Sequence, residues 1–114
     1  TAAKHAIVGL TKNVAAELCR CAIRVNCIAP HAMVTPMAAK AYFGDPEAIE
    51  EVTKEIEKTS PIKGRPGLAS DVAQAALWLA SDESGYTNGH CLATDGGYTT
   101  GSRDTAPGWA DGSP

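Results

Sequence analysis

The sequence has 114 residues, a length that fits one small domain with a modest hydrophobic core. Ten Lys and Arg against thirteen Asp and Glu give a net charge of -3, which provides no basic surface for a nucleic acid. No apolar run is long enough to cross a membrane, and the start does not resemble a signal peptide. We therefore predict a cytoplasmic protein without nucleic-acid or membrane partners. Since the first residue is Thr1, we interpret the sequence as the interior of a longer chain.

Residues 2 to 18 are predicted to form an amphipathic helix. Apolar side chains recur there at every third or fourth position, at Ala3, Ile7, Leu10, Val14 and Leu18. Such spacing predicts one buried stripe along the helix. The helix should end between residues 19 and 22, where the glycine that commonly ends a helix is absent. An alanine held there at positive φ would cost about 1 kcal/mol.

A strand is predicted next, from Ile23 to Ala29, because β-branched residues alternate there with polar ones. Pro30 should end this strand, since proline cannot donate a hydrogen bond to a β-ladder. The loop that follows carries Met33 and Thr35. In α/β proteins such a loop at the end of a strand is a common place for a ligand.

The motif Asp45-Pro46-Glu47 predicts the start of a second helix, with Asp45 as the N-cap. Its thin apolar stripe, Ile49, Val52 and Ile56, and a Glu50 to Lys54 ion pair are typical of a surface lid helix.

Beyond a breaker-rich segment, Ser70 and Asp71 should open a third helix that continues through Leu79. Residues 90 to 95 then predict a short strand, followed by a glycine turn at residues 96 and 97. From residue 101 onward the chain is rich in Gly, Pro, Ser, Asp and Thr, so we predict a disordered tail over 101–114.

Four cysteines, Cys19, Cys21, Cys27 and Cys91, raise the question of a metal site or a disulfide. Cys19-x-Cys21 lacks the C-x-x-C spacing of zinc sites, and the three histidines do not complete one. We therefore predict no metal, and reduced cysteines that serve in packing.

The order of elements predicts an incomplete α/β fold. Two strands joined by a long helical crossover should be parallel. Two strands are too few for a sheet that is buried on both faces. We interpret residues 1–100 as part of an α/β domain whose other strands lie outside this sequence.

Several segments together resemble one family. They are TAAKHAIVGLTKNVAAEL, IRVNCIAPHAMVTPM, SDVAQAALWLASDES and GHCLATDGGYTT, and they occur in order over about residues 1–100. With these segments in this order, the chain resembles the C-terminal half of short-chain dehydrogenases/reductases. It is most similar to the plant alcohol-dehydrogenase-like group that includes secoisolariciresinol dehydrogenase and the tasselseed proteins. The resemblance implies the C-terminal part of a Rossmann-type, doubly wound parallel sheet.

The resemblance also implies roles for individual residues. The family's Tyr-x-x-x-Lys signature maps its lysine to Lys4, a catalytic and ribose-binding residue, while its tyrosine would stand directly before Thr1. Two residues four apart share one face of a helix, so an ammonium can favour the ionised form of a phenol. Pro30, the backbone of Met33, and the hydroxyl of Thr35 map to the loop that holds the nicotinamide carboxamide.

Other positions are given lesser roles. Met37, with the segment 38–43, resembles the variable substrate loop, although a methionine that only fills a core is an equal alternative. His31 stands where many members have glycine, and we interpret it as a surface histidine without a catalytic role. We interpret Asn26 and Asp95-Gly96-Gly97 as structural or subunit-contact residues.

The predicted function is therefore part of an NAD(P)-dependent oxidoreductase acting on an alcohol or ketone, with NAD favoured and NADP not excluded. The family resemblance implies a homodimer or homotetramer. The sequence holds neither the Gly-rich phosphate loop nor the catalytic Ser and Tyr, so the chain alone should be inactive. The alternative is a non-catalytic piece that only associates with related subunits. An unrelated small α/β binding module is a third possibility.

Overall fold

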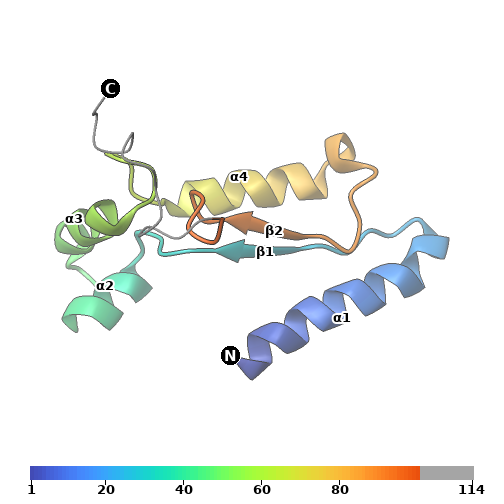
Figure 1. The fold of residues 1–114 in the computed structure, drawn as a ribbon, viewed down its shortest axis with the longest axis horizontal. Coiled ribbons are helices and arrows are strands. Elements are labelled where there is room, and N and C mark those ends of the chain that lie inside the picture. Colours follow the sequence, from blue (N-terminus) through green and yellow to red (C-terminus); the bar gives the residue numbers. More distant parts are fainter. Residues whose placement is uncertain (101–114) are drawn as a thin grey trace.

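The structure is a computed structural model that describes residues 1–100 (Figure 1). The predicted disordered tail, 101–114, lies outside the described residues. In chain order the elements are α1 (Ala2–Leu18), the 3-10 helix η1 (Cys19–Cys21), β1 (Cys27–Pro30), α2 (Pro36–Phe43), α3 (Ile49–Thr59), α4 (Ala69–Ala80), the 3-10 helix η2 (Asp82–Ser84) and β2 (Cys91–Thr94).

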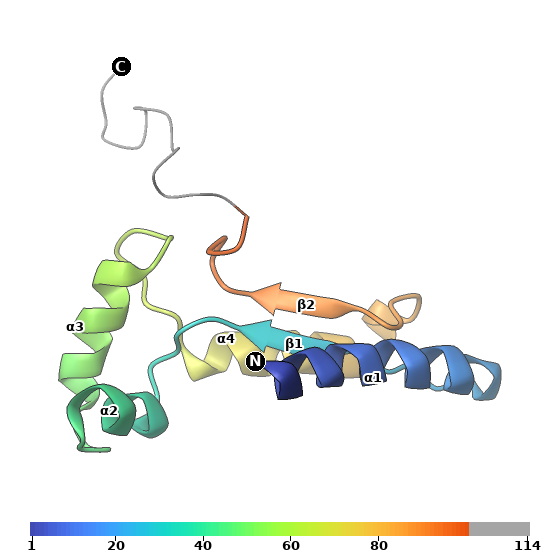
Figure 2. The same cartoon turned by 60° about the horizontal axis from the view of Figure 1, so that its bottom comes forward.

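The two strands pair in parallel, which confirms the predicted crossover. The register places Cys27 opposite Cys91 and Pro30 opposite Thr94. Helices α1 and α4 lie on opposite sides of the strand pair (Figures 1 and 2). This is the helix-sheet-helix layering of a doubly wound fold. Within residues 1–100 the sheet has only these two strands.

Helix α1 has the predicted extent but buries a different face. Thr11 and Ala15 are its buried residues, whereas Ile7 and Leu10 of the predicted stripe are 47% and 63% exposed. The prediction assumed a sheet wide enough to cover the whole stripe. Because β1 is the strand that α1 contacts, much of its apolar surface stays uncovered in the described chain.

The end of α1 confirms the expected irregularity. Ala22 adopts the left-handed conformation, with φ 57° and ψ 28°, and its N–H donates to the carbonyl of Cys19. Glycine is the residue that ordinarily occupies this conformation. Cys19 and Cys21 are exposed, so for these two the predicted packing role is wrong.

Strand β1 begins four residues later than predicted. The N–H of Val25 donates to Oδ1 of Asn88 at 2.8 Å, and the side chain of Asn26 bonds Thr87 and His90. Side chains therefore satisfy the backbone where a ladder was expected, and the structural role predicted for Asn26 is confirmed.

Helix α2 was missed by the sequence analysis, which assigned its residues to a loop. Thr35 is its N-cap and Pro36 its first residue, and Gly44 ends it with φ 78°. These residues are strong signals for the ends of a helix. The eight residues between them show little amphipathicity, so their spacing did not predict a helix. Helix α3 starts at Ile49 and not at Pro46, because Asp45 caps a separate turn by accepting from the N–H of Glu47.

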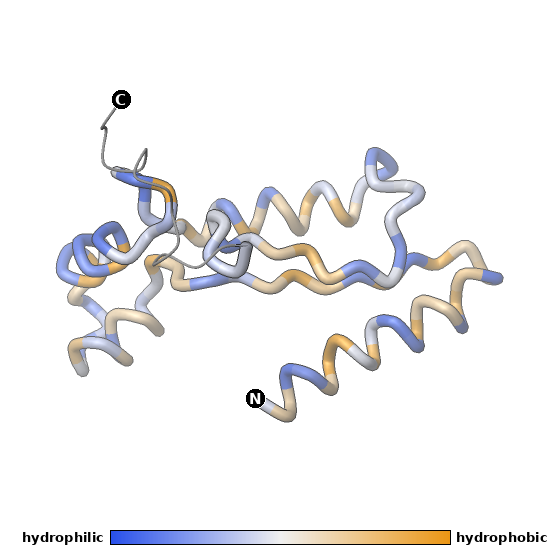
Figure 3. The backbone as a smooth tube through the Cα atoms, in the orientation of Figure 1, coloured by the Kyte–Doolittle hydropathy of each residue, from blue (hydrophilic) through white to orange (hydrophobic). Residues whose placement is uncertain are grey.

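The small core lies between α2 and α3. It consists of the fully or almost fully buried Ala39, Val52 and Ile56. The predicted pair of Lys54 and Glu50 is present at 2.9 Å on the exposed side of α3. Figure 3 shows the two strands as largely apolar and α3 as largely polar. Helix α3, the predicted lid helix, is thus packed mainly on α2.

Candidate functional site

The loop after β1 is fixed by hydrogen bonds on both sides. The N–H of His31 donates to the carbonyl of Thr94 at 3.3 Å, and the N–H of Val34 donates to that of Gly67 at 2.8 Å. Within residues 1–100 the intervening N–H of Met33 donates to no other backbone carbonyl. The loop therefore holds the amide of Met33, like that of Ala32, in place without a backbone acceptor.

A second contact tightens this loop from outside. A Cβ atom added to Gly67 would lie 2.7 Å from the carbonyl oxygen of Ala32 and 2.8 Å from Sδ of Met33. Only a glycine allows the 67–68 segment to approach so closely. The glycine thereby supports the geometry of residues 32–34.

Lys4 and Pro30 line the same cavity of about 440 Å³, although they come from α1 and β1. Its other lining residues are apolar or carry thiols: Ile7, Val8, Cys27, Ile28, Ala29 and Cys91. Among residues 1–100, Lys4 is thus the one charged side chain that lines this cavity. The structure brings together these two of the predicted site residues.

Thr35 and Met37 lie beyond that cavity, at the start of α2. Oγ1 of Thr35 accepts from the N–H of Ala38 at 3.1 Å, so its own O–H remains able to donate to a ligand. Met37 is 81% exposed in the described chain. Neither residue lines the cavity of about 440 Å³ that contains Lys4.

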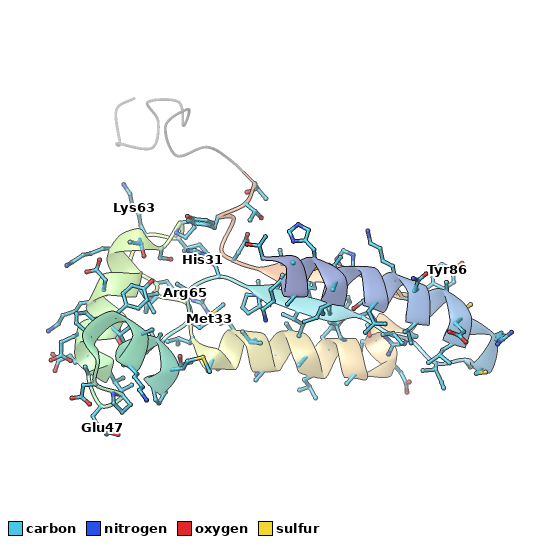
Figure 4. The ribbon with its side chains drawn as sticks, turned by 90° about the horizontal axis from the view of Figure 1, so that it is seen from below. His31, Met33, Glu47, Lys63, Arg65 and Tyr86 are labelled. Carbon is cyan, nitrogen blue, oxygen red and sulfur yellow. The ribbon has the colours of Figure 1, made fainter. Side chains whose placement is uncertain are left out.

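Met33 contributes to a smaller cavity of about 210 Å³. This cavity lies between the β1 loop, the end of α3 and the turn after β2, and its polar lining residues include His31, Arg65, Asp71 and Asp95. Figure 4 shows His31, Met33 and Arg65 gathered at the end of β1 that faces α2 and α3. Lys4 and Pro30 thus line one cavity and Met33 the other, whereas Thr35 and Met37 line neither of these two cavities.

His31 is half-buried and not the surface residue that was predicted. Its ring stacks on Tyr98 with the centroids 3.7 Å apart and an interplanar angle of 17°. The stack connects the β1 loop to the turn after β2. Nothing in the sequence near His31 indicates this contact, because the two rings are far apart along the chain.

Two carboxylates of the smaller cavity are stabilised in their ionised form. A hydrogen bond from Arg65, together with one from the N–H of Leu68, lowers the pKa of Asp71. Bonds from the hydroxyl and N–H of Thr99 and from the N–H of Gly97 lower the pKa of Asp95. Both carboxylates are therefore charged at neutral pH.

The sequence analysis missed the contribution of Thr94, Arg65 and Asp95 to this cavity. Within the described residues, Oγ1 of Thr94 is buried without a hydrogen-bond partner. For Thr94 and Asp95 the available signal was their position, since Thr94 is the last residue of β2, which runs parallel to β1, and Asp95 directly follows it. The carboxyl ends of parallel strands meet at one edge of the sheet.

The chain is similar to known proteins over most of its length. Residues 1–99 match the family model described as enoyl-(acyl carrier protein) reductase. Momilactone A synthase of Oryza sativa subsp. japonica is 47% identical over 100 residues, which cover 87% of this chain and 35% of that protein. Secoisolariciresinol dehydrogenase of Forsythia intermedia is 44% identical over 96 residues, covering 84% and 34%.

The fold of the chain is also similar to that of a solved structure. The crystal structure of levodione reductase superposes with a TM-score of 0.73 and 39% identity, covering 89% of this chain and 39% of that one. The chain therefore spans about a third of the length of the curated relatives described above. In the described part of the chain, no helix combines the length and apolarity that a bilayer crossing needs, and no cluster of three metal-ligating side chains occurs.

Proposed function

The chain belongs to the short-chain dehydrogenase/reductase family, and on that premise we propose that it forms the nicotinamide-binding part of an NAD(P)-dependent oxidoreductase. The reaction would move a hydride between the nicotinamide and the carbon of a secondary alcohol or ketone. The observation that carries the proposal is the cavity shared by Lys4 and Pro30. It joins the predicted catalytic lysine to the start of the predicted cofactor loop.

Lys4 would act on a tyrosine four positions earlier. That tyrosine would stand directly before Thr1 and on the same face of α1. An ammonium near a phenol favours the phenolate and lowers a pKa that is ordinarily about 10. The phenol could then exchange a proton with a substrate hydroxyl near neutral pH, which is general acid-base catalysis.

The β1 loop would orient the nicotinamide. The amide of Met33 and the hydroxyl of Thr35 can donate hydrogen bonds, which suits the carbonyl oxygen of a carboxamide. Pro30 stiffens the loop where it leaves the strand. A bound nicotinamide supplies the hydride acceptor or donor, and the protein supplies position and proton transfer.

Further properties follow from the same family. Members use NAD(P), and the resemblance to the plant group supports NAD over NADP. We propose a small alcohol or ketone substrate, a homodimer or homotetramer of the complete enzyme, and a cytoplasmic location. Met37, on α2, is proposed to contact the substrate.

The test joins this chain to the N-terminal half of a family member that supplies the Gly-rich loop, the serine and the tyrosine, here called the restored enzyme. We expect NAD-dependent oxidation of a secondary alcohol. Lys4→Ala should lower kcat/KM by at least about 100-fold, in line with the loss of a group that assists acid-base catalysis. Lys12→Ala, on the same helix but outside the cavity lining, is the control and should retain activity. Full activity of Lys4→Ala would remove Lys4 from the mechanism.

A second candidate function is association without catalysis. It is favoured by the apolar surface that the described chain leaves uncovered, which includes Leu10, Leu77 and the fully exposed Tyr86. Such a piece would bind related subunits through its helices or the unpaired edge of β1. Calorimetry of the 114-residue chain with NAD tests the second candidate, because tight binding of NAD would contradict a piece that only associates. We expect no tight binding by the chain alone, since it lacks a pyrophosphate loop.

A further inference from the structure

Cys27 and Cys91 are paired directly across the parallel ladder of β1 and β2. Residues in such a pair extend their side chains to the same face of the sheet. Neighbouring strands lie about 4.8 Å apart, within the range of about 4.4 to 6.8 Å between Cα atoms that a disulfide requires. The register therefore brings the Cα atoms of these two cysteines within the separation that a disulfide spans.

Both thiols face the cavity that contains Lys4. They are half-buried and line it together with Ile7 and Val8 of α1. A cavity of about 440 Å³ with mainly apolar walls can admit a small uncharged reagent. Cys19 and Cys21 differ, since they are exposed on η1 at the far end of α1.

We propose that Cys27 and Cys91 form a dithiol modification site, which a small disulfide converts reversibly into an intramolecular disulfide. In the first step the thiolate of Cys27 attacks one sulfur of the reagent. A mixed disulfide forms, and one reagent thiol leaves. The thiol of Cys91 then loses its proton and attacks Sγ of Cys27, which releases the second reagent thiol.

The electrons balance over the two steps. The two protein thiols lose two electrons and two protons, and the reagent disulfide gains them as two thiols. Cys27 is assigned the first attack because a hydrogen bond with Cys27 and burial raise the pKa of Cys91, which keeps Cys91 protonated. Lys12 opposes that rise in pKa. The product would connect β1 to β2 in the wall of the cavity.

The test uses the 114-residue chain with Cys19→Ser and Cys21→Ser, treated with hydroxyethyl disulfide and followed by mass spectrometry. We expect the chain to lose the mass of two hydrogen atoms and to yield a digest peptide in which Cys27 is linked to Cys91. Adding Cys91→Ser should give a stable adduct on Cys27 instead. Two separate adducts without a link, or links only between chains, would overturn the proposal.

A rate comparison keeps the proposal testable whether or not the serine variants fold well. The unmodified cysteine pair should link at least about tenfold faster in buffer than in concentrated urea, because the ladder register holds the thiols together. Equal rates in the two solvents would mean that the register does not juxtapose them. Both readouts are independent of cofactor binding, so they stand apart from the proposed oxidoreductase function.

Discussion

The hydroxyl of Thr35 accepts a hydrogen bond from the N–H of Ala38 at 3.1 Å, so one side chain both begins α2 and borders the β1 loop. A capping hydroxyl uses its lone pairs toward the helix and keeps its proton for another acceptor. In the proposed enzyme that acceptor is the nicotinamide carboxamide. Helix α2 and the β1 loop are thereby joined at a single residue.

This dual role predicts a divided effect of substitution at Thr35. Thr35→Ala should lower the free energy of unfolding of the restored enzyme by about 1 kcal/mol, because the N-cap is lost. It should also raise the Kd for NAD. Thr35→Ser keeps the hydroxyl, so its free energy of unfolding and its Kd for NAD should both stay close to those of the unchanged enzyme. Urea unfolding and calorimetry measure the two effects, and an unaltered Kd in Thr35→Ala would remove its hydroxyl from the site.

Gly67→Ala should disturb the β1 loop. The new Cβ would meet the carbonyl oxygen of Ala32 at 2.7 Å, a contact that requires the backbone to move. We expect a loss of about 1 to 3 kcal/mol in the free energy of unfolding. Gly9→Ala is the matched control, because its Cβ meets nothing within 4 Å and lies inside α1. It should stabilise the protein by up to about 1 kcal/mol.

Ala22→Gly should stabilise the protein. Ala22 has φ 57°, which glycine adopts without the Cβ penalty. We expect a gain of up to about 1 kcal/mol in the free energy of unfolding. Ala16→Gly, at an exposed position inside α1, should instead cost about 0.5 to 1 kcal/mol. If both substitutions destabilise equally, the left-handed conformation at Ala22 is not a source of strain.

Asp71 should contribute to a loss of stability in acid. Its pKa is lowered from an ordinary value of 3.8, mainly by Arg65. A lowered pKa in the folded state gives stability that is present above 3.8 and is lost as the pH falls below it. In Asp71→Asn the free energy of unfolding should therefore fall less steeply as the pH drops below 3.8, which acid unfolding at a series of pH values measures. Asp82→Asn makes the same change of charge away from Arg65 and is the control. If both variants show the same pH dependence of the free energy of unfolding, the Asp71–Arg65 pair is not its source.

The elements that the sequence predicted well are those with a strong local signal. Helix α1 has three- and four-residue apolar spacing, and Gly96 and Gly97 both have positive φ, as a glycine turn requires. Helix α2 was missed although Thr35, Pro36 and Gly44 mark its ends, because eight mainly apolar residues show no clear helical period. The start of β1 was misplaced because the side chain of Asn88, far along the chain, takes the bond that a ladder would use.

The amino-acid sequence by itself determined the family, the parallel α/β arrangement and the residues proposed for the nicotinamide site, since ordered motifs and local periodicity are properties of the chain. Only the tertiary structure decided that Lys4 and Pro30 share a cavity, that His31 stacks on Tyr98, and that Cys27 faces Cys91. These contacts join residues that are distant along the chain. Their geometry depends on how helices and strands pack in space, which no local pattern of residues encodes.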